Sequence, residues 1–117
     1  MSEPKGKAVH QSEIPAEVVQ DEGAQGVTIQ WLIAERDGAP NFYMRRFTVA
    51  PGGFTPKHSH EHEHEVYCLA GRGEVLIGDK WHPFEKDFVI FVPPWVEHQF
   101  KNTGDEDLVF LCLVPAK

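Results

Sequence analysis

The chain has no long apolar run, few cysteines and no excess of basic residues. Its apolar runs fall well short of the roughly 20 residues that a membrane-spanning helix needs, and residues 1–11 are too polar for a signal peptide. Lysine and arginine number 11 against 18 aspartates and glutamates, and the formal net charge is -7. Because nucleic acid is bound through clustered basic side chains, this balance argues against such a partner. We expect a cytoplasmic protein that binds neither membrane nor nucleic acid.

Two cysteines, Cys68 and Cys112, make up the thiol content of the chain. Each lies inside an apolar run, a pattern typical of buried free thiols in a reducing compartment and not of a disulfide framework. The 117 residues suffice for one domain and leave little room for a second. We therefore expect a single domain at residues 26–117, preceded by a partly irregular segment at residues 1–25.

Helical periodicity is also scarce, because only residues 13–20 could form a turn of helix and Pro15 weakens it. From residue 26 onward, short β-branched and aromatic runs alternate with glycine, proline, asparagine and aspartate, which is typical of strands joined by turns. The predicted strands are 27–34, 42–49, 58–60, 65–69, 73–77, 80–84, 88–92, 97–102 and 108–114, with a turn at 51–53 among others. Many short strands with closely spaced turns predict an all-β antiparallel sandwich or barrel.

Four of the seven histidines crowd into residues 58–65, which read His-Ser-His-Glu-His-Glu-His-Glu. Alternate side chains of a strand point to one face, so His58 and His60 can bind one metal together. A third donor is expected from a neighbouring strand, and His98 follows the rigid Pro93-Pro94 turn at the start of one. The alternative is that this run is a solvated strand edge or an adventitious metal-binding surface.

The spacing around these histidines resembles the two motifs of the cupin superfamily. The first motif is Gly-(x)5-His-x-His-(x)3,4-Glu-(x)6-Gly, and the second is Gly-(x)5-Pro-x-Gly-(x)2-His-(x)3-Asn. The residues of this chain that match them are Gly52, His58, His60, Gly71, Pro93, His98 and Asn102. Asp87 and Trp95 stand where the second motif has its two glycines.

The position of the motif glutamate is the main departure from the cupin pattern. His64 occupies it when the residues are counted from His60 and also from Gly71, whereas Glu65 fits only the longer spacing from His60. We expect His64 to be the third ligand and keep Glu65 as the alternative. The chain also resembles small manganese-binding cupins at residues 39–53 and 110–113, including single-domain proteins with four-histidine sites.

This resemblance implies a single-domain jelly-roll barrel whose interior binds a divalent transition metal. The implied ligands are His58, His60, His64 and His98. Manganese or iron is expected from the resemblance, although imidazole also suits nickel, copper, cobalt and zinc. No other cofactor is expected.

Four histidine ligands would leave an octahedral ion with two open positions and its full positive charge, which favours an anionic ligand. Together with a resemblance to cupin dioxygenases, this implies a metal-dependent oxidoreductase, dioxygenase-like, that acts on a small enolisable or aromatic molecule. The alternatives are a metal-dependent isomerase or lyase that stabilises an enediolate, and a small-molecule-binding barrel without catalysis.

Several side chains are candidates for the substrate pocket. Phe110 and Cys112 share strand parity and could face the metal, as could Phe100, which shares parity with His98. Arg45 could neutralise a substrate anion. The alternative is that the first three are ordinary core residues and that Arg45 lies on the outer face.

His62 is expected to point to solvent, on a chain that loops out between His60 and His64. His10 and His82 lack metal-like spacing and are expected on the surface.

Residues 27–33 carry apolar side chains on both faces of a predicted strand. Such a strand often meets a partner, and cupins that resemble this chain commonly pair through the N-terminal part of their sheet. We expect a homodimer. The alternative is that residues 14–19 of the same chain cover the second face of this strand.

Overall fold

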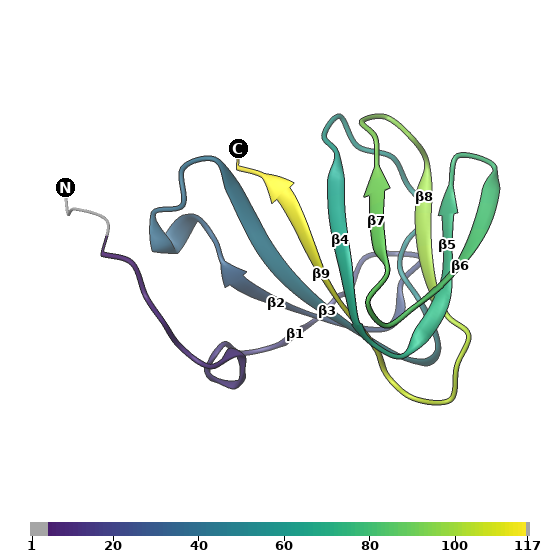
Figure 1. The fold of residues 1–117 in the computed structure, drawn as a ribbon, viewed down its shortest axis with the longest axis horizontal. Helices are drawn as coiled ribbons and strands as arrows, with labels where there is room; N and C mark the ends of the chain where they lie inside the picture. Colours follow the sequence, from purple (N-terminus) through teal and green to yellow (C-terminus); the bar gives the residue numbers. More distant parts are fainter. Residues whose placement is uncertain (1–4, 117) are drawn as a thin grey trace.

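The computed structural model describes residues 5–116, and most of this part of the chain is β structure (Figure 1). The strands are β1 (Glu17–Val18), β2 (Gln25–Ile33), β3 (Phe42–Phe54), β4 (His64–Ala70), β5 (Arg72–Ile77), β6 (Lys80–Glu85), β7 (Val89–Val92), β8 (His98–Asn102) and β9 (Leu108–Pro115). Two short 3-10 helices, η1 (Gln11–Glu13) and η2 (Glu35–Asp37), accompany them. Neither these nor any other helix in the described part has the length and apolar character of a membrane span.

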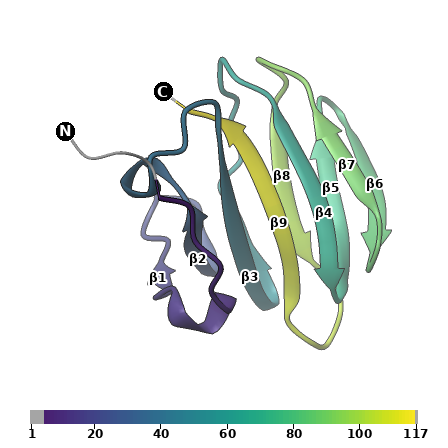
Figure 2. The same ribbon diagram turned by 60° about the vertical axis from the view of Figure 1, so that its left-hand side comes forward.

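All strand pairs are antiparallel, and they form one sheet that curls on itself (Figures 1 and 2). The strand order is β6-β5-β8-β3-β9-β4-β7, with β2 paired to β3 and β1 to β2. The 13 residues of β3 carry the sheet from one wall of the barrel to the other. Most of β3 pairs with β2 and β9, and its last residue, Phe54, pairs with Lys101 of β8 as well as with Gln25 of β2. The predicted all-β antiparallel barrel is confirmed.

The core lies inside the curled sheet because the strands alternate between buried and exposed side chains. In β4, His64, Val66 and Cys68 face inward, whereas Glu65 and Tyr67 face outward. The buried apolar side chains that form the core are Val27, Val49, Val66, Cys68, Val75, Phe84, Ile90, Val92, Phe100, Leu108, Phe110, Cys112 and Val114. Both cysteines are buried free thiols, as predicted from their apolar neighbours.

Three local predictions are wrong. Residues 58–60 do not form a strand, since His58 alone makes an isolated bridge, with His98. The turn predicted at 51–53 lies inside β3, where Gly52 has a φ of 79° and the register against β2 shifts by several residues. Instead of a turn of helix at 13–20, the chain forms η1 and then β1, in which Glu17 pairs with Ile29 at the edge of β2.

Two of the motif glycines allow a matched test of steric constraint. Gly71 and Gly52 both have left-handed backbones, with φ of 82° and 79°. A Cβ atom at Gly71 would lie 2.5 Å from the carbonyl oxygen of Asp107, whereas one at Gly52 would meet nothing within 4 Å. We predict that Gly71→Ala lowers the free energy of unfolding by about 1–3 kcal/mol more than Gly52→Ala does. Urea unfolding of the two variants measures this difference, and equal losses would contradict it.

Candidate metal centre

Backbone hydrogen bonds bring two distant segments of the chain together at the histidines. The amide of His58 donates to the carbonyl of His98 at 3.1 Å, and the amide of His98 donates back at 2.9 Å. The amide of Trp95 donates to the carbonyl of His60 at 2.6 Å. His64 and His98 are also the first residues of β4 and β8. The segment 58–64 is therefore held against the segment that leads into β8.

The four expected ligands lie close together. The ring centroid of His58 lies 4.1 Å from that of His60 and 5.0 Å from that of His98. The ring centroid of His64 lies 4.6 Å from that of His98. The ligand atoms of His58, His60 and His98 all lie within 4.8 Å of one another. His64 joins this group through His60, since Nε2 of His64 lies 3.3 Å from Nδ1 of His60.

These histidines are neutral at physiological pH. Burial is the largest cause in each case: it lowers the pKa of His64 to about 3 and the pKa of His60 to about 4. The pKa values of His58 and His98 are also lowered, chiefly by burial. Neutral imidazole is the form that binds a metal, so no proton needs to be displaced near pH 7.

The hydrogen bond of the His98 ring leaves its Nε2 atom available. Nδ1 of His98 lies 3.0 Å from the carbonyl oxygen of Val96 and donates to it, so Nε2 carries the lone pair. Nδ1 of His64 lies 3.5 Å from Nη2 of Arg45 and 3.5 Å from Sγ of Cys112, while its Nε2 faces His60. Two nitrogens bound to one ion at about 2.0–2.1 Å are roughly 3.0–3.4 Å apart, which matches the spacing of His60 and His64. The donor set fits a divalent transition metal.

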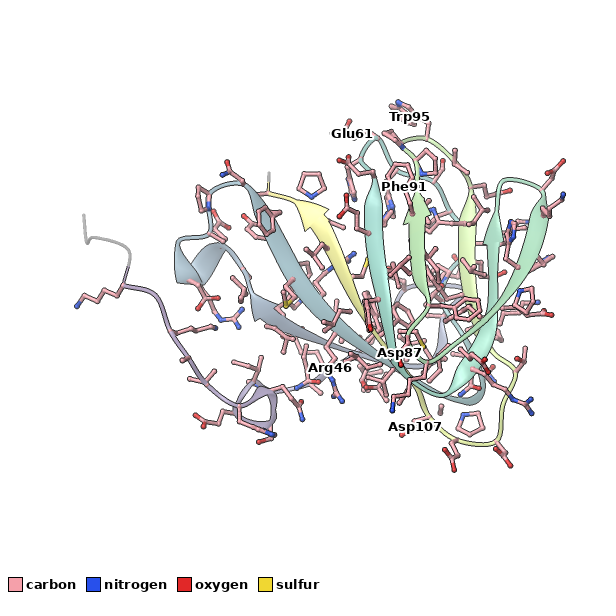
Figure 3. All side chains as sticks on the ribbon, in the orientation of Figure 1. Arg46, Glu61, Asp87, Phe91, Trp95 and Asp107 are labelled. Carbon is pink, nitrogen blue, oxygen red and sulfur yellow. The ribbon has the colours of Figure 1, made fainter. Side chains whose placement is uncertain are left out.

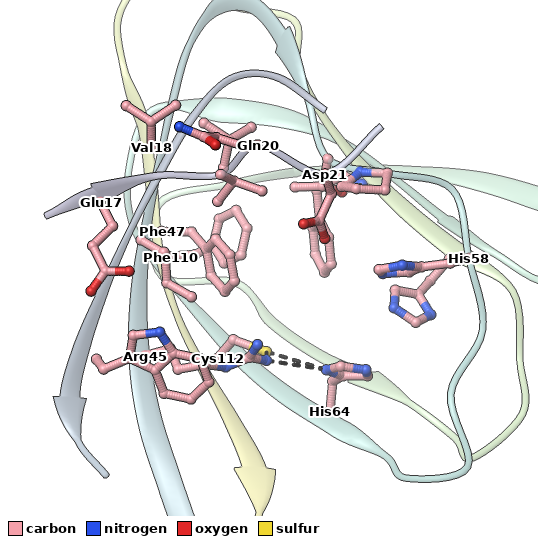
Figure 4. Close-up of a pocket in the computed structure, with 18 of the residues that line it drawn as sticks. Glu17, Val18, Gln20, Asp21, Arg45, Phe47, His58, His64, Phe110 and Cys112 are labelled. Carbon is pink, nitrogen blue, oxygen red and sulfur yellow. Dashed lines mark hydrogen bonds between the residues drawn. The ribbon is translucent and has the colours of Figure 1, made fainter. Parts of the chain in front are cut away.

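A cavity of about 350 Å³ adjoins the histidines (Figure 4). All four expected ligands line it, and so do the predicted pocket residues Arg45, Phe100, Phe110 and Cys112. The rings of Phe100 and Phe110 stack at 4.7 Å, and that of Phe110 stacks on Phe47 at 5.3 Å. An apolar aromatic wall thus faces a polar wall of imidazoles.

Arg45 points into this cavity and not to the outer face. Its guanidinium lies 5.5 Å from the ring centroid of Trp31 and 5.0 Å from that of Phe47. Its Nη2 donates to Sγ of Cys112 at 3.0 Å, and its buried Nε has no hydrogen-bond partner. Burial raises the pKa of the Cys112 thiol. Because the thiol is a weak acceptor, the cation keeps unused donor capacity beside the histidines.

Residues 17–21 line the cavity, a role that the sequence analysis did not assign to them although it offered residues 14–19 as a cover for β2. Figure 4 shows Glu17 near Arg45 and Asp21 on the side of His58. Trp31 was also missed as a lining residue. A two-residue strand of exposed side chains has no periodicity, so the sequence does not mark β1 as part of the cavity wall.

Glu65 and His62 flank the expected ligand His64 in different surroundings. Glu65 lies on the outward face of β4, opposite to His64, so it does not share the cavity with His60. His62 is half-buried on the loop between His60 and His64, and its ring stacks on that of His60 at 4.9 Å. His10 and His82 are exposed, as expected.

Comparison with known proteins identifies the family. The family described as "Cupin domain" matches residues 45–114, from β3 through β9. The chain is a cupin. The matched region holds all four expected ligands.

Three similar proteins illustrate the range of named roles. The chain is 38% identical to the 1-methylthio-D-xylulose 5-phosphate methylsulfurylase of Rhodospirillum rubrum. The match covers 63% of this chain and 47% of the relative, so the chain spans about half of that protein. It is 30% identical to the oxalate-binding protein of Thermotoga maritima, over 97% of this chain and 98% of the relative. The structure of the polyketide cyclase RemF from Streptomyces resistomycificus has a TM-score of 0.90 and 34% identity, covering 97% of this chain and 81% of that one.

Asp87 and Trp95, which stand in place of the two glycines of the second cupin motif, both have a left-handed backbone. Asp87 and Trp95 have φ values of 74° and 70°, and within residues 5–116 they are the non-glycine residues with positive φ. Such values are uncommon for residues with a Cβ atom. At Trp95 the strained backbone directs the amide toward His60, which supports the histidine loop.

The ligand set can be tested by single alanine substitutions. We predict that removing any one of His58, His60, His64 or His98 lowers metal occupancy at least about tenfold at limiting metal. Glu65→Ala should leave it unchanged because that side chain faces outward. Inductively coupled plasma mass spectrometry after equilibrium dialysis measures occupancy. Full occupancy in His64→Ala together with loss in Glu65→Ala would show that the third ligand is misassigned.

Proposed function

We propose that this cupin is a metal-dependent enzyme acting on a small anionic molecule with neighbouring carbonyl or carboxylate oxygens. The observation that carries the proposal is the convergence of four neutral imidazoles and the under-used guanidinium of Arg45 on one cavity. A divalent ion held there would act as a Lewis acid on a carbonyl oxygen and favour loss of a proton from the neighbouring carbon. Manganese or iron is our proposed metal.

The roles of the chain's own residues follow from their places in the cavity. Arg45 would pair with a carboxylate or phosphate of the substrate, because its guanidinium lies near the rings of Trp31 and Phe47 and its buried Nε has no hydrogen-bond partner. The aromatic wall would exclude water from the rest of the molecule. Asp21, on the side of His58, is a carboxylate placed to accept a proton from bound substrate (Figure 4).

The named relatives support this substrate class. A xylulose 5-phosphate derivative, a polyketide and oxalate all carry carbonyl or carboxylate oxygens, which can bind a metal through two atoms. A cyclase and a methylsulfurylase act on carbonyl compounds, so we place the isomerase or lyase class first. A binding protein without catalysis is the alternative that the oxalate-binding relative favours.

The dioxygenase-like oxidoreductase predicted from the sequence is our second candidate. Open metal positions beside a bound substrate would also serve dioxygen. We place it second because the histidine groups contain no carboxylate, unlike the two-histidine, one-carboxylate sites of many iron oxygenases.

Pyruvate is a suitable probe because it carries a carboxylate next to an enolisable ketone. We predict that the manganese-loaded protein accelerates exchange of its methyl protons for deuterium in anaerobic D2O, as followed by NMR. Arg45→Gln should raise the half-saturating pyruvate concentration about tenfold or more through loss of a charge-assisted hydrogen bond. Arg46→Gln is the matched control, since the neighbouring Arg46 bonds to Gln11 and Gln30 outside the cavity.

The outcomes separate the candidate functions. Oxygen consumption with pyruvate, without anaerobic exchange, would replace the proposal by the oxidoreductase. Saturable binding with neither reaction would favour a binding protein. Equal effects of the two arginine variants would contradict the role of Arg45.

We also propose a homodimer, on a different surface from the one that the sequence suggested. Residues of β2 are covered by their own chain: Ile29 and Trp31 line the cavity, and Gln30 bonds to the carbonyls of Gln11 and Ile14. Exposed apolar side chains gather instead on the outer face of β4 and β7, where Tyr67 pairs with Val89. A contiguous apolar patch of this kind favours a partner.

Light scattering tests the dimer. We predict a mass of about twice 13.3 kDa at micromolar concentration and a shift toward the monomer in Phe91→Glu, since Phe91 is 56% exposed on this face. Trp81→Glu, on the exposed face of β6, is the control. A monomeric wild type, or a dimer that survives Phe91→Glu, would contradict this surface.

A further inference from the structure

His62 lies in the histidine cluster although it is not one of the four expected ligands. Its ring lies parallel to that of His60, with a centroid distance of 4.9 Å and an interplanar angle of 5°. Its centroid lies 5.1 Å from that of His64. The ligand atoms of His60, His62 and His64 all lie within 4.8 Å of one another. These three therefore form a second group that could hold one ion.

The two groups share His60 and differ in their relation to the cavity. We call His58, His60 and His98 the inner group and His60, His62 and His64 the outer group. All members of the inner group line the cavity, as does His64, whereas His62 does not. An ion in the outer group would therefore sit farther from the substrate cavity while still bound by two of the four expected ligands.

The two groups are equally buried, each with two half-buried histidines and one buried histidine, and they differ in what lies beside them. The inner group faces the cavity, which residues 17–21 help to line, whereas His62 lies outside the cavity lining on the loop between His58 and β4. Glu61 and Trp95 mark this end of the barrel in Figure 3, opposite to Asp87 and Asp107. The exposed Glu61 is adjacent to His62 in the chain, and a carboxylate there raises the local concentration of divalent cations.

We propose that His62 is an uptake ligand, which binds an incoming divalent ion with His60 and His64 and then releases it to the inner group. The ion keeps its bonds to His60 and His64 while the bond to His62 breaks and bonds to His58 and His98 form. This inference rests on the metal centre proposed above and not on the reaction.

An uptake ligand has a kinetic signature that distinguishes it from a permanent ligand. A residue that stabilises only the path between free and bound ion changes association and dissociation by the same factor, so the dissociation constant stays the same. A permanent ligand instead stabilises the bound state, and its loss weakens equilibrium affinity. The two roles therefore separate in one set of measurements.

Stopped-flow absorption with Co2+ tests the proposal on the full chain. We expect His62→Ala to slow both Co2+ association and release into a chelator about tenfold or more, with stoichiometry and dissociation constant unchanged. His62→Gln keeps the side-chain length and should behave alike. His82→Ala, an exposed histidine on β6, is the matched control and should leave both rates at the wild-type value.

Each other outcome overturns a defined claim. Wild-type rates in both His62 variants, or slower uptake in His82→Ala to the same extent, would overturn the uptake role. A weaker affinity with an unchanged association rate would make His62 a permanent ligand instead. Absence of Co2+ binding by the wild type would refute the metal centre itself.

Discussion

The pair of backbone hydrogen bonds between His58 and His98 is the constraint on which the site depends. The bonds join a loop that follows β3 to the first residue of β8, although forty residues of chain separate them. Neither segment holds enough imidazoles for a metal centre alone. The bridge works because β3 reaches across the barrel and ends beside β8, so the chain that leaves it arrives next to His98. The barrel fold and the metal site therefore depend on the same pairing of β3 with β8.

Burial gives this cluster its chemistry. Five imidazoles crowded at one end of a barrel would repel one another if protonated, and desolvation keeps the expected ligands neutral. Arg45 is the fixed positive charge that remains on the cavity wall, and the rings of Trp31 and Phe47 flank it. Such a site is poor at holding cations other than a coordinated metal and is suited to small anions.

Much of this architecture was predictable because short apolar runs bounded by turn residues mark strands such as β4, β5 and β9. The cupin motifs also place His58, His60 and His98 without structural information. Predictions failed where local pattern and long-range pairing disagree. Residues 58–60 have strand-like spacing but gain only one bridging partner, and Gly52 produces a bulge inside β3 instead of a turn. The choice between His64 and Glu65 depends on which of the two side chains faces inward at the start of β4. A shift of one residue in the strand would exchange its two faces.

X-ray absorption spectroscopy at the edge of the bound metal tests the central claim most directly. The account predicts a first shell of nitrogen and oxygen atoms alone, with the multiple scattering of about four imidazole rings, and a change in the oxygen shell when oxalate is added. A sulfur atom in the first shell, which would make Cys112 a ligand, would contradict the account. So would a shell dominated by carboxylate oxygens or one that oxalate leaves unchanged.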